Sequence, residues 1–411
     1  DLFQQGYNEN VFQFGAAGLK AYCTELKPET LDDLIAVIAL YRPGPIEIKA
    51  HLDFIKIKNG LMSPSYDFMC KEITKDTNSL LIYQEQIMKI CQVVGGFTLI
   101  EADDIRKAMG KSKMDVMLSY KQRFVDGAIK QGCSKFEAEK IWDKMEGFAN
   151  YCFNKAHSVA YALTGYQSQW LKAHYPLQFW VTSLRLSETD IIPKRIYEIK
   201  KTGNIDILPP DINKSQELFS YDLQTNSIYW SISSIAYAGD AAVTSIMKDR
   251  EENGPFYSFK EFKARIKKTA NKRVVTNLIL SGCFDEIEKI KTLPDRLTIL
   301  KQHLGEELPE GFNSDNLWKE YFWALQQKKI CGFGYIDYEK LYKNVNFKNK
   351  FELVQMADLE NDSAVGKNKT LIGVVDEITI KPSRKGEFAQ IELNSNDIFG
   401  TCVIWAEIWP K

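Results

Sequence analysis

The spacing of apolar residues constrains the fold of this chain most, because it changes from a helical to a strand period along the sequence. Through residues 1–190 apolar side chains recur at helical spacing, for example from Leu80 to Val94, where the pattern stops at Gly95. From Thr370 to Ile380 and from Phe388 to Trp405 apolar and polar residues alternate, as in half-buried strands. The sequence therefore predicts a mainly α fold followed by strands.

Length and composition exclude several classes of protein. The chain has 411 residues, 45% of them hydrophobic and 26% charged, with a net charge of −1. This is too apolar for a disordered protein, and at roughly 100–200 residues per domain the length predicts two to four domains. No stretch approaches the roughly 18–20 apolar residues that span a bilayer. The first residues show no signal peptide, so we expect a cytoplasmic protein with no membrane partner. Because the chain begins without Met, in what reads as the middle of a domain, we expect a fragment of a longer protein.

Cysteine and histidine usage argues against a zinc protein or a hydrolase. The eight cysteines form no C-x-x-C pair, and none of the four histidines stands beside a cysteine at zinc-ligand spacing. Neither a phosphate-binding P-loop nor the G-x-S-x-G turn of serine hydrolases occurs. We therefore predict reduced thiols, no metal site and no catalytic residue of these kinds.

The strongest local charge feature runs from Ile105 to Arg123. It contains six Lys and Arg residues against Asp115 alone, which gives a net charge of +5, and Gly110 indicates a turn that would direct several cations at one ligand. Such clusters neutralise a triphosphate or a nucleic-acid backbone. A solvated helix surface is the alternative interpretation.

The segment from Phe153 to Tyr161 is a second candidate site. Asn154 and Ser158 could cap the following helix, whose N-terminus favours anions. Lys155 and His157 add positive charge at the same end, and Tyr161 could stack on a base. The alternative is a purely structural histidine.

Two further features concern charged residues. The pairs Asp32-Asp33 and Asp103-Asp104 do not suit a two-metal centre, since adjacent helical residues diverge by about 100°, and helix capping explains Asp32-Asp33 better. Between Lys260 and Arg273 seven basic residues face one acidic residue, a net charge of +6, and the preceding turn with Gly239 looks like a helix-hairpin-helix. Such a hairpin offers backbone N–H groups to DNA phosphates; a basic solvated face is the alternative.

An ordered set of motifs points to a known family. It comprises Val11-Phe12-Gln13-Phe14, Leu40 to Pro45, Ile82 to Met88, Arg106 to Lys111, the segment 153–161, and Trp170 to Pro176. In order and spacing this set resembles the bacterial DNA polymerase III alpha subunit family, the C family of replicative polymerases, over nearly all of residues 1–190. There the stretch is the fingers domain, which closes on the incoming deoxynucleoside triphosphate.

The resemblance implies roles for individual residues. It implies nucleotide binding by Arg42, Arg106, Lys107, Lys111, Lys113, Asn154, Lys155, His157, Ser158 and Tyr161. It implies DNA binding by Lys121, Arg123, Gly239, Lys267, Lys268, Lys272, Arg273, Arg384 and Lys385.

The later parts of the chain are also similar to this family. Pro209 to Ser215 resembles the start of its helix-hairpin-helix region, Asn271 to Asp285 the end of that region, and residues 369–405 its OB-fold, a barrel suited to single-stranded template. We therefore expect fingers at 1–190, a helix-hairpin-helix-containing domain with short strands at 191–290, an irregular connection at 291–365, and a partial OB-fold at 366–411.

The sequence departs from the family pattern at several places. Tyr237 replaces the first hairpin glycine, and no sliding-clamp peptide follows the hairpin region. Gln216 to Phe219 mimics such a peptide in the wrong place, so we predict Leu218 and Phe219 to be core residues. The palm domain, whose carboxylates hold Mg²⁺ in this family, lies upstream of the fingers and is not recognised here. This divergence and the Lys-, Asn- and Ile-rich usage suit a phage-encoded homologue.

The resulting hypothesis is the fingers and DNA-binding portion of a replicative DNA polymerase whose Mg²⁺ lies outside this chain. Its expected partners are primer–template DNA, the incoming dNTP, a sliding clamp and other replisome proteins. The alternative is a non-catalytic DNA-binding accessory replication protein that retains the fingers and OB-fold without a palm. Dependence of DNA binding on a cognate triphosphate favours the polymerase.

Overall fold

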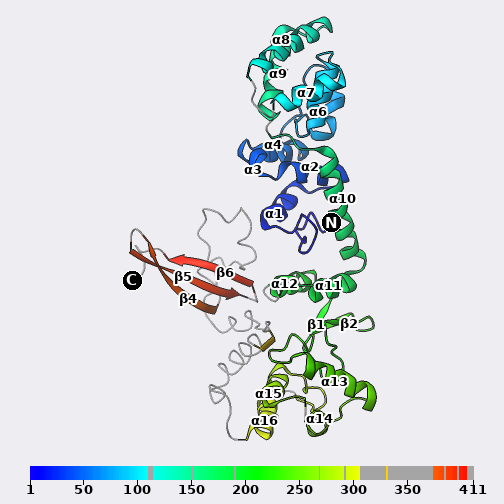
Figure 1. Cartoon of the computed structure of the whole chain (residues 1–411), viewed down its shortest axis with the longest axis vertical. Helices are drawn as coiled ribbons and strands as arrows, with labels where there is room; N and C mark the ends of the chain where they lie inside the picture. The colour runs from blue at the N-terminus through cyan, green and yellow to red at the C-terminus, as the bar shows by residue number, and fades with distance from the viewer. Residues whose placement is uncertain are drawn as a thin grey trace. The chain divides into compact units, whose positions relative to one another are not determined.

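The computed structural model describes residues 1–109, 114–149, 151–188, 191–267, 269–290, 293–305, 330–331, 374–383, 386–395 and 398–404. The chain divides into two compact units, Asp1–Ala173 and His174–Lys411. Helices dominate both units, with small three-stranded sheets in the second, which confirms the mainly α prediction (Figure 1). Among the described residues, no helix is both long and apolar enough to cross a membrane.

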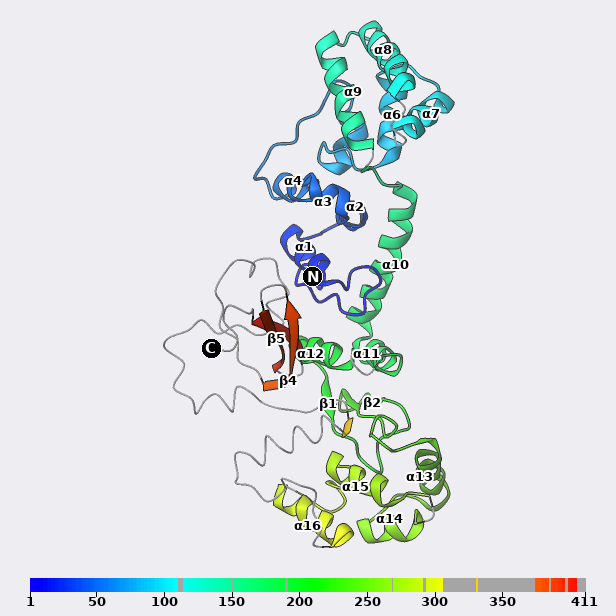
Figure 2. The same cartoon turned by 60° about the vertical axis from the view of Figure 1, so that its left-hand side comes forward.

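The first unit contains two hydrophobic cores. One forms among the N-terminal helices and the middle of α10, around Phe14, Leu26, Val37, Phe54 and Ala162. Its helices are α1 (Ala17–Leu26), α2 (Leu31–Leu40), α3 (Pro43–Glu47), α4 (Ala50–Lys58) and α10 (Lys155–His174). In both Figure 1 and Figure 2 the N-terminal segment runs beside α10.

The second core of this unit lies among α6 to α9. Its largest buried side chains are Phe124 and Trp142, whose ring centroids are 5.5 Å apart. The elements are α5 (Lys71–Thr74), η1 (Lys75–Thr77), α6 (Gln84–Val93), α7 (Leu99–Met109), α8 (Met114–Lys130) and α9 (Lys135–Ala149). Gly127 of α8 packs directly on the backbone of Gly95, a contact that any larger residue would block.

Helix α2 begins with a capping box. Thr30 accepts a hydrogen bond from the backbone N–H of Asp33, and the Asp33 carboxylate accepts one from the N–H of Thr30. The same carboxylate pairs with Lys58 at 3.0 Å and accepts from the N–H of Glu29 at 2.8 Å. Burial acts to raise the pKa of Asp33, but the bonds from Glu29, Lys58 and Thr30 together hold that pKa below its usual value. The predicted capping role of Asp33 is confirmed.

Asp33→Asn should lower the free energy of unfolding by about 1–2 kcal/mol at pH 7, the typical cost of losing a helix cap. Since the pKa of Asp33 is lowered in the folded state, its contribution is present above the unfolded pKa of about 3.9 and is lost as the pH falls through the folded pKa. Denaturant unfolding at pH 7 and pH 3 checks this. Asp53→Asn, which removes an exposed pair with Lys56, is the control and should change little. An equal cost of D33N at both pH values would contradict the prediction.

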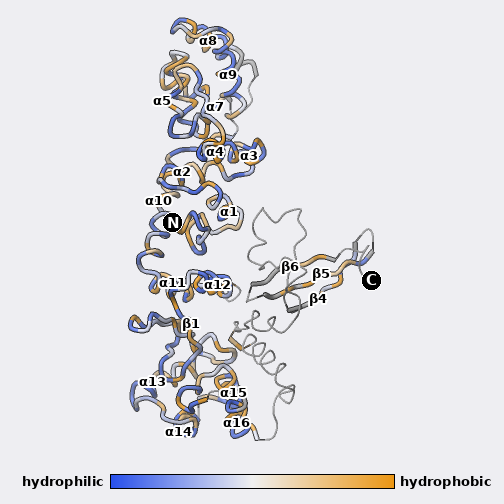
Figure 3. Tube along the Cα trace, turned by 180° about the vertical axis from the view of Figure 1, so that it is seen from behind, coloured by the Kyte–Doolittle hydropathy of each residue, from blue (hydrophilic) through white to orange (hydrophobic). Residues whose placement is uncertain are grey.

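The second unit has its own core, around Trp180, Trp230, Phe262, Leu278 and Phe284. A small sheet has the order β1-β3-β2, with β1 parallel and β2 antiparallel to β3. Its elements are α11 (Pro176–Arg185), α12 (Ile192–Thr202), β1 (Asp206–Leu208), β2 (Ser220–Asp222), β3 (Ser227–Tyr229), α13 (Asp240–Asn253), α14 (Phe259–Arg265), α15 (Lys272–Ser281) and α16 (Leu293–Leu304). Hydrophobic and hydrophilic residues intermix along α13 to α16, as expected for helices with one buried face (Figure 3).

The predicted core position of Phe219 is confirmed, but that of Leu218 is wrong. Phe219 is buried and packs edge-on against Trp230 with ring centroids 4.9 Å apart, whereas Leu218 is 48% exposed. The carbonyls of Gln216 and Glu217 accept hydrogen bonds from residues 232 and 233. This pairing fixes the backbone so that only one of the two adjacent side chains faces the core.

The predicted C-terminal strands are confirmed as a sheet of order β4-β5-β6, formed by β4 (Val374–Ser383), β5 (Gly386–Ser395) and β6 (Ile398–Ile404). Neighbouring strands pair antiparallel, and β4 and β5 form a hairpin that closes at Ser383 opposite Gly386. The OB-fold and the four-part domain division stay predictions.

Candidate nucleotide and nucleic-acid interface

Two segments far apart in the sequence meet in the first unit and form what we call the junction, residues 82–86 and 151–158. The N–H of Phe153 donates to the carbonyl of Ile82 at 2.9 Å, and the N–H of Gln84 donates to the carbonyl of Phe153 at 3.0 Å. This parallel bridge between Tyr83 and Phe153 places the N-terminus of α6 beside that of α10. It brings together side chains about 70 residues apart.

Glu85 of α6 fixes the N-terminus of α10. Both of its carboxylate oxygens accept from the N–H of Lys155 at 3.0 Å, and one accepts from the Asn154 amide at 3.1 Å. Asn154 in turn accepts from the N–H of His157 at 2.8 Å, so its predicted capping is confirmed. Ser158 is not a cap; it is fully buried, and its Oγ has no hydrogen-bond partner among the described residues. Sequence reasoning missed Glu85, although it lies in a motif that carries the family resemblance.

Arg42 secures the other side of the junction. Its Nε donates to the carbonyl of Ala39 at 2.8 Å and its Nη2 to the carbonyl of Tyr151 at 2.7 Å. The guanidinium also lies 4.1 Å from the centre of the Phe153 ring. Burial lowers the pKa of Arg42, yet a guanidinium stays charged in proteins. Arg42 therefore positions the junction backbone and adds positive charge beneath it.

Arg106 and Lys107 on α7 share one carboxylate. Arg106 bonds to Asp103 Oδ1 through Nε at 3.0 Å, and Lys107 bonds to Asp103 Oδ2 at 2.6 Å. These two cations, Lys107 foremost, lower the pKa of Asp103. Arg106 also donates to Gln84 Oε1 at 3.3 Å, which ties it to the junction. The other predicted cations of this cluster, Lys111 and Lys113, lie outside the described residues.

Four rings form a row that begins in the junction and continues beyond it, and we call them the aromatic row. Phe153 meets His157 with ring centroids 5.2 Å apart, His157 meets Tyr161 at 4.0 Å, and Tyr161 meets Phe12 at 5.2 Å. Lys155 Nζ, at the N-terminus of α10, lies 5.5 Å from the centre of the ring of Tyr83, which precedes α6. The structure thus brings together the predicted residues Asn154, Lys155, His157 and Tyr161, and adds Phe12.

Lys121 and Arg123 on α8 take part in other contacts. Lys121 pairs with Asp143 at 2.5 Å, and Arg123 pairs with Glu101 at 2.6 Å and lies 4.7 Å from the centre of the Phe97 ring. The backbone and hydroxyl of Thr98, together with Arg123, lower the pKa of Glu101 to about 2. Both cations connect neighbouring helices, and no contact in the described part of the chain links them to the junction.

In the second unit the predicted hairpin turn precedes α13. Gly239 caps that helix with φ −71°, whereas Tyr237, where a glycine was expected, has φ +68°. The Arg273 guanidinium lies 3.4 Å from the centre of the Tyr237 ring. Lys267, Lys272 and Arg273 are exposed, while Lys268, Arg384 and Lys385 lie outside the described residues. Tyr237 therefore takes a left-handed conformation that normally favours glycine.

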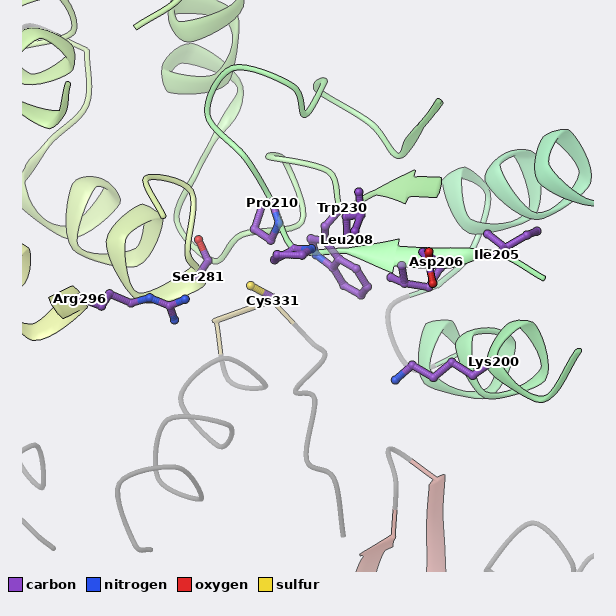
Figure 4. Close-up of a pocket in the computed structure, with 11 residues that line it drawn as sticks. Lys200, Ile205, Asp206, Leu208, Pro210, Trp230, Ser281, Arg296 and Cys331 are labelled. Carbon is purple, nitrogen blue, oxygen red and sulfur yellow. The ribbon is translucent and has the colours of Figure 1, made fainter. Parts of the chain in front are cut away.

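A cavity of about 580 Å³ lies elsewhere in the second unit, along β1. In Figure 4, Leu208, Pro210 and Trp230 lie between Arg296 and Lys200. Arg296 pairs with Asp285, which compensates its charge. None of the predicted site residues lines this cavity. Within the described residues, no three His, Cys, Asp or Glu side chains converge as metal ligands.

Two protein-family models match this chain. Residues 1–132 match the bacterial DNA polymerase III alpha subunit finger domain, and residues 204–292 match a helix-hairpin-helix motif. The two matched regions contain the junction segment 82–86 and the Tyr237 turn, respectively. The molecule thus has the domain content of a polymerase fingers region and a helix-hairpin-helix region.

Curated relatives narrow this class to one family. The DNA polymerase III subunit alpha of Aquifex aeolicus is 33% identical over 422 residues, covering 100% of this chain and 35% of the relative. That of Campylobacter jejuni is 40% identical and that of Thermus aquaticus 36%, each over 69% of this chain and 24% of the relative. The chain belongs to the family of bacterial DNA polymerase III alpha subunits, as its motifs predicted. It spans about a third or less of the length of these relatives. Phage origin stays a prediction.

Proposed function

We propose that this chain is the fingers and DNA-binding portion of a replicative DNA polymerase, which binds an incoming dNTP and primer–template DNA. The observation that carries the proposal is the junction, where Glu85 holds the N-terminus of α10 next to the cations of α7. Family membership supplies the class of reaction, attack of a primer 3′-hydroxyl on a triphosphate with release of pyrophosphate. The helix-hairpin-helix region, with Lys267, Lys272 and Arg273 exposed, is the proposed contact to the DNA backbone.

Divalent metal chemistry belongs, in this proposal, to palm carboxylates outside the chain. The described acidic residues do not fit a Mg²⁺ centre, because Asp103 is paired with Arg106 and Lys107 and Glu85 accepts from the α10 N-terminus. What this chain contributes is positioning and charge neutralisation, the largest demands of phosphoryl transfer on a protein. Arg106, Lys107 and Lys155 are the proposed triphosphate ligands.

Arg106→Ala and Lys155→Ala should each weaken dNTP binding by about 10- to 100-fold, because a charge-assisted hydrogen bond contributes about 1.5–3 kcal/mol. Titration of a fluorescently labelled dNTP against the 411-residue chain at low salt measures the change. Lys89→Ala removes an exposed cation from the same region, on α6, and should leave the affinity unchanged. Equal affinities for both variants and the unmodified chain, or an equal loss in K89A, would refute this triphosphate site.

A further inference from the structure

The segment from Tyr7 to Phe14 presents one aromatic ring outward. Val11 and Phe14 are buried, whereas Phe12 between them is 42% exposed. The ring of Phe14 packs against α10 where Gly165 leaves space, since a Cβ there would lie 2.5 Å from the Phe14 ring. The segment is therefore fixed by its inner side chains, while Phe12 faces outward.

The backbone of this segment is left-handed on both sides of Phe12. Asn10 has φ +55° and Gln13 has φ +64°; asparagine adopts this conformation readily, whereas it costs a residue such as glutamine roughly 1–2 kcal/mol. Strain of this kind persists where the surrounding structure enforces it, and it concentrates at functional sites. Here the strained backbone is what brings the Phe12 ring to Tyr161.

Buried polar groups of α10 enforce this conformation. Lys172, only 3% exposed, donates to the carbonyls of Tyr7 and Glu9 at 2.9 Å, and Gln169 donates to the carbonyl of Tyr7 at 3.0 Å. Figure 2 shows the N-terminal segment along α10. Burying the charge of a lysine costs free energy. Lys172 nevertheless holds this loop in place, although the outward side chain of the loop, Phe12, is not part of the hydrophobic core.

The aromatic row ends at Phe12. At the opposite end the Arg42 guanidinium covers Phe153, and the inner rings of His157 and Tyr161 stack on each other at 4.0 Å. Phe12 is thus the terminal ring. A terminal, exposed aromatic ring is a platform on which an unpaired base of any sequence can stack.

We propose that Phe12 stacks on an unpaired base of single-stranded DNA, while the segment that carries it is held in place by Lys172 and Gln169. The proposal rests on the proposed function, because it assigns a template strand to the surface that is also proposed to bind the triphosphate. A strand is favoured over the base of the dNTP by the geometry of the row. His157 and Tyr161 lie between Phe12 and Phe153 in the aromatic row. Phe153 belongs to the backbone bridge, on the side of the row where Lys155 and Arg106 lie. The proposal therefore assigns the base on Phe12 to a different nucleotide from the one whose phosphates reach those cations.

The test compares two labelled strands of equal length, oligo(dT) and a strand of abasic sites, by fluorescence anisotropy with the 411-residue chain. Phe12→Ala should weaken oligo(dT) binding by about tenfold and leave abasic-strand binding unchanged, because stacking needs a base and phosphate contacts do not. Phe12→Trp should retain the affinity. Phe136→Ala, which removes a 79% exposed ring from α9, is the matched control and should change neither affinity.

Several outcomes would overturn the proposal. These are unchanged oligo(dT) binding in F12A, an equal loss on both strands, and a loss of labelled dNTP binding with oligo(dT) binding intact, which would make the dNTP base the ligand. If F12A does not fold, Phe12→Leu keeps an apolar side chain without an aromatic face and should show the same selective loss. Failure of the triphosphate site is seen separately, in R106A and K155A with the dNTP.

Discussion

Gly127→Ala is expected to destabilise the α6–α9 core by about 3 kcal/mol, at the upper end of overpacking costs. An added Cβ at Gly127 would lie 2.1 Å from the carbonyl oxygen of Gly95 and 2.8 Å from its carbonyl carbon. The obstacle is backbone, which cannot rotate away as a side chain can. Gly95 cannot retreat either, since the Phe124 and Phe97 rings and the Cys91 carbonyl lie around it. Helix α8 would have to move outward and lose its contact with the end of α6.

Gly147→Ala is the matched control for this prediction. Gly147 also lies within a helix of the same core, α9, but it is exposed and nothing lies within 4 Å of an added Cβ. Alanine is the better helix former, so G147A should stabilise by about 0.5–1 kcal/mol. Amide hydrogen exchange of peptides from α6, α8 and α9 measures both effects. Exchange in G127A that matches the unmodified chain would show that the close approach is absent in solution.

Local sequence patterns predicted the helices well where caps and periodicity coincide. The apolar run from Leu80 to Val94 contains α6 (Gln84–Val93), and the apolar residues at helical spacing from Glu137 to Phe148 lie in α9. Residues 272–280 likewise carry apolar residues at helical spacing, and they lie in α15, which begins after the Asn271 cap. In each case the start, the apolar face and the stop are set by residues within one or two turns, so local information suffices.

The junction could not be predicted in this way. Glu85 and Lys155 meet only because a backbone bridge joins Tyr83 to Phe153, and nothing local to either segment encodes that pairing. The burial of Lys172 could not be predicted for a different reason. A lysine is expected at the surface, and its burial depends on carbonyls about 165 residues away.

Charge counting was informative only in part. The window from Ile105 to Arg123 has a net charge of +5, but Asp103 and Glu101 lie just outside it and pair with Arg106, Lys107 and Arg123. Asp143, from another helix, pairs with Lys121. Because helix neighbours lie three or four residues apart and tertiary partners lie anywhere, a linear window overstates the charge that a ligand meets.

Lys172→Met should lower the free energy of unfolding of the N-terminal core by about 3 kcal/mol. It takes the Lys172 donor from the buried carbonyl of Glu9, which costs about 1–3 kcal/mol, and it removes one of two donors from the carbonyl of Tyr7, to which Gln169 still donates, at about 1 kcal/mol. Methionine conserves the length of the side chain but removes the donors to the carbonyls of Tyr7 and Glu9. Replacing a buried charge by an apolar group is often harmless when its partners are replaced too. Here the carbonyls of Tyr7 and Glu9 belong to the backbone, which no single substitution can remove.

The same variant connects stability to DNA binding. Without Lys172 the segment from Tyr7 to Phe14 loses one of its anchors to α10, so amide exchange in that segment should rise more than in α6–α9. Base-dependent binding of oligo(dT) should fall with it, although Lys172 is buried and cannot touch DNA.

Lys135→Met, which removes one exposed i,i+4 pair with Glu139 on α9, is the control and should cost less than about 0.5 kcal/mol. If K172M kept both its stability and its preference for oligo(dT) over the abasic strand, the buried lysine would not be what holds Phe12 in place. Since the strained backbone relaxes once the anchor is removed, the two losses must appear together.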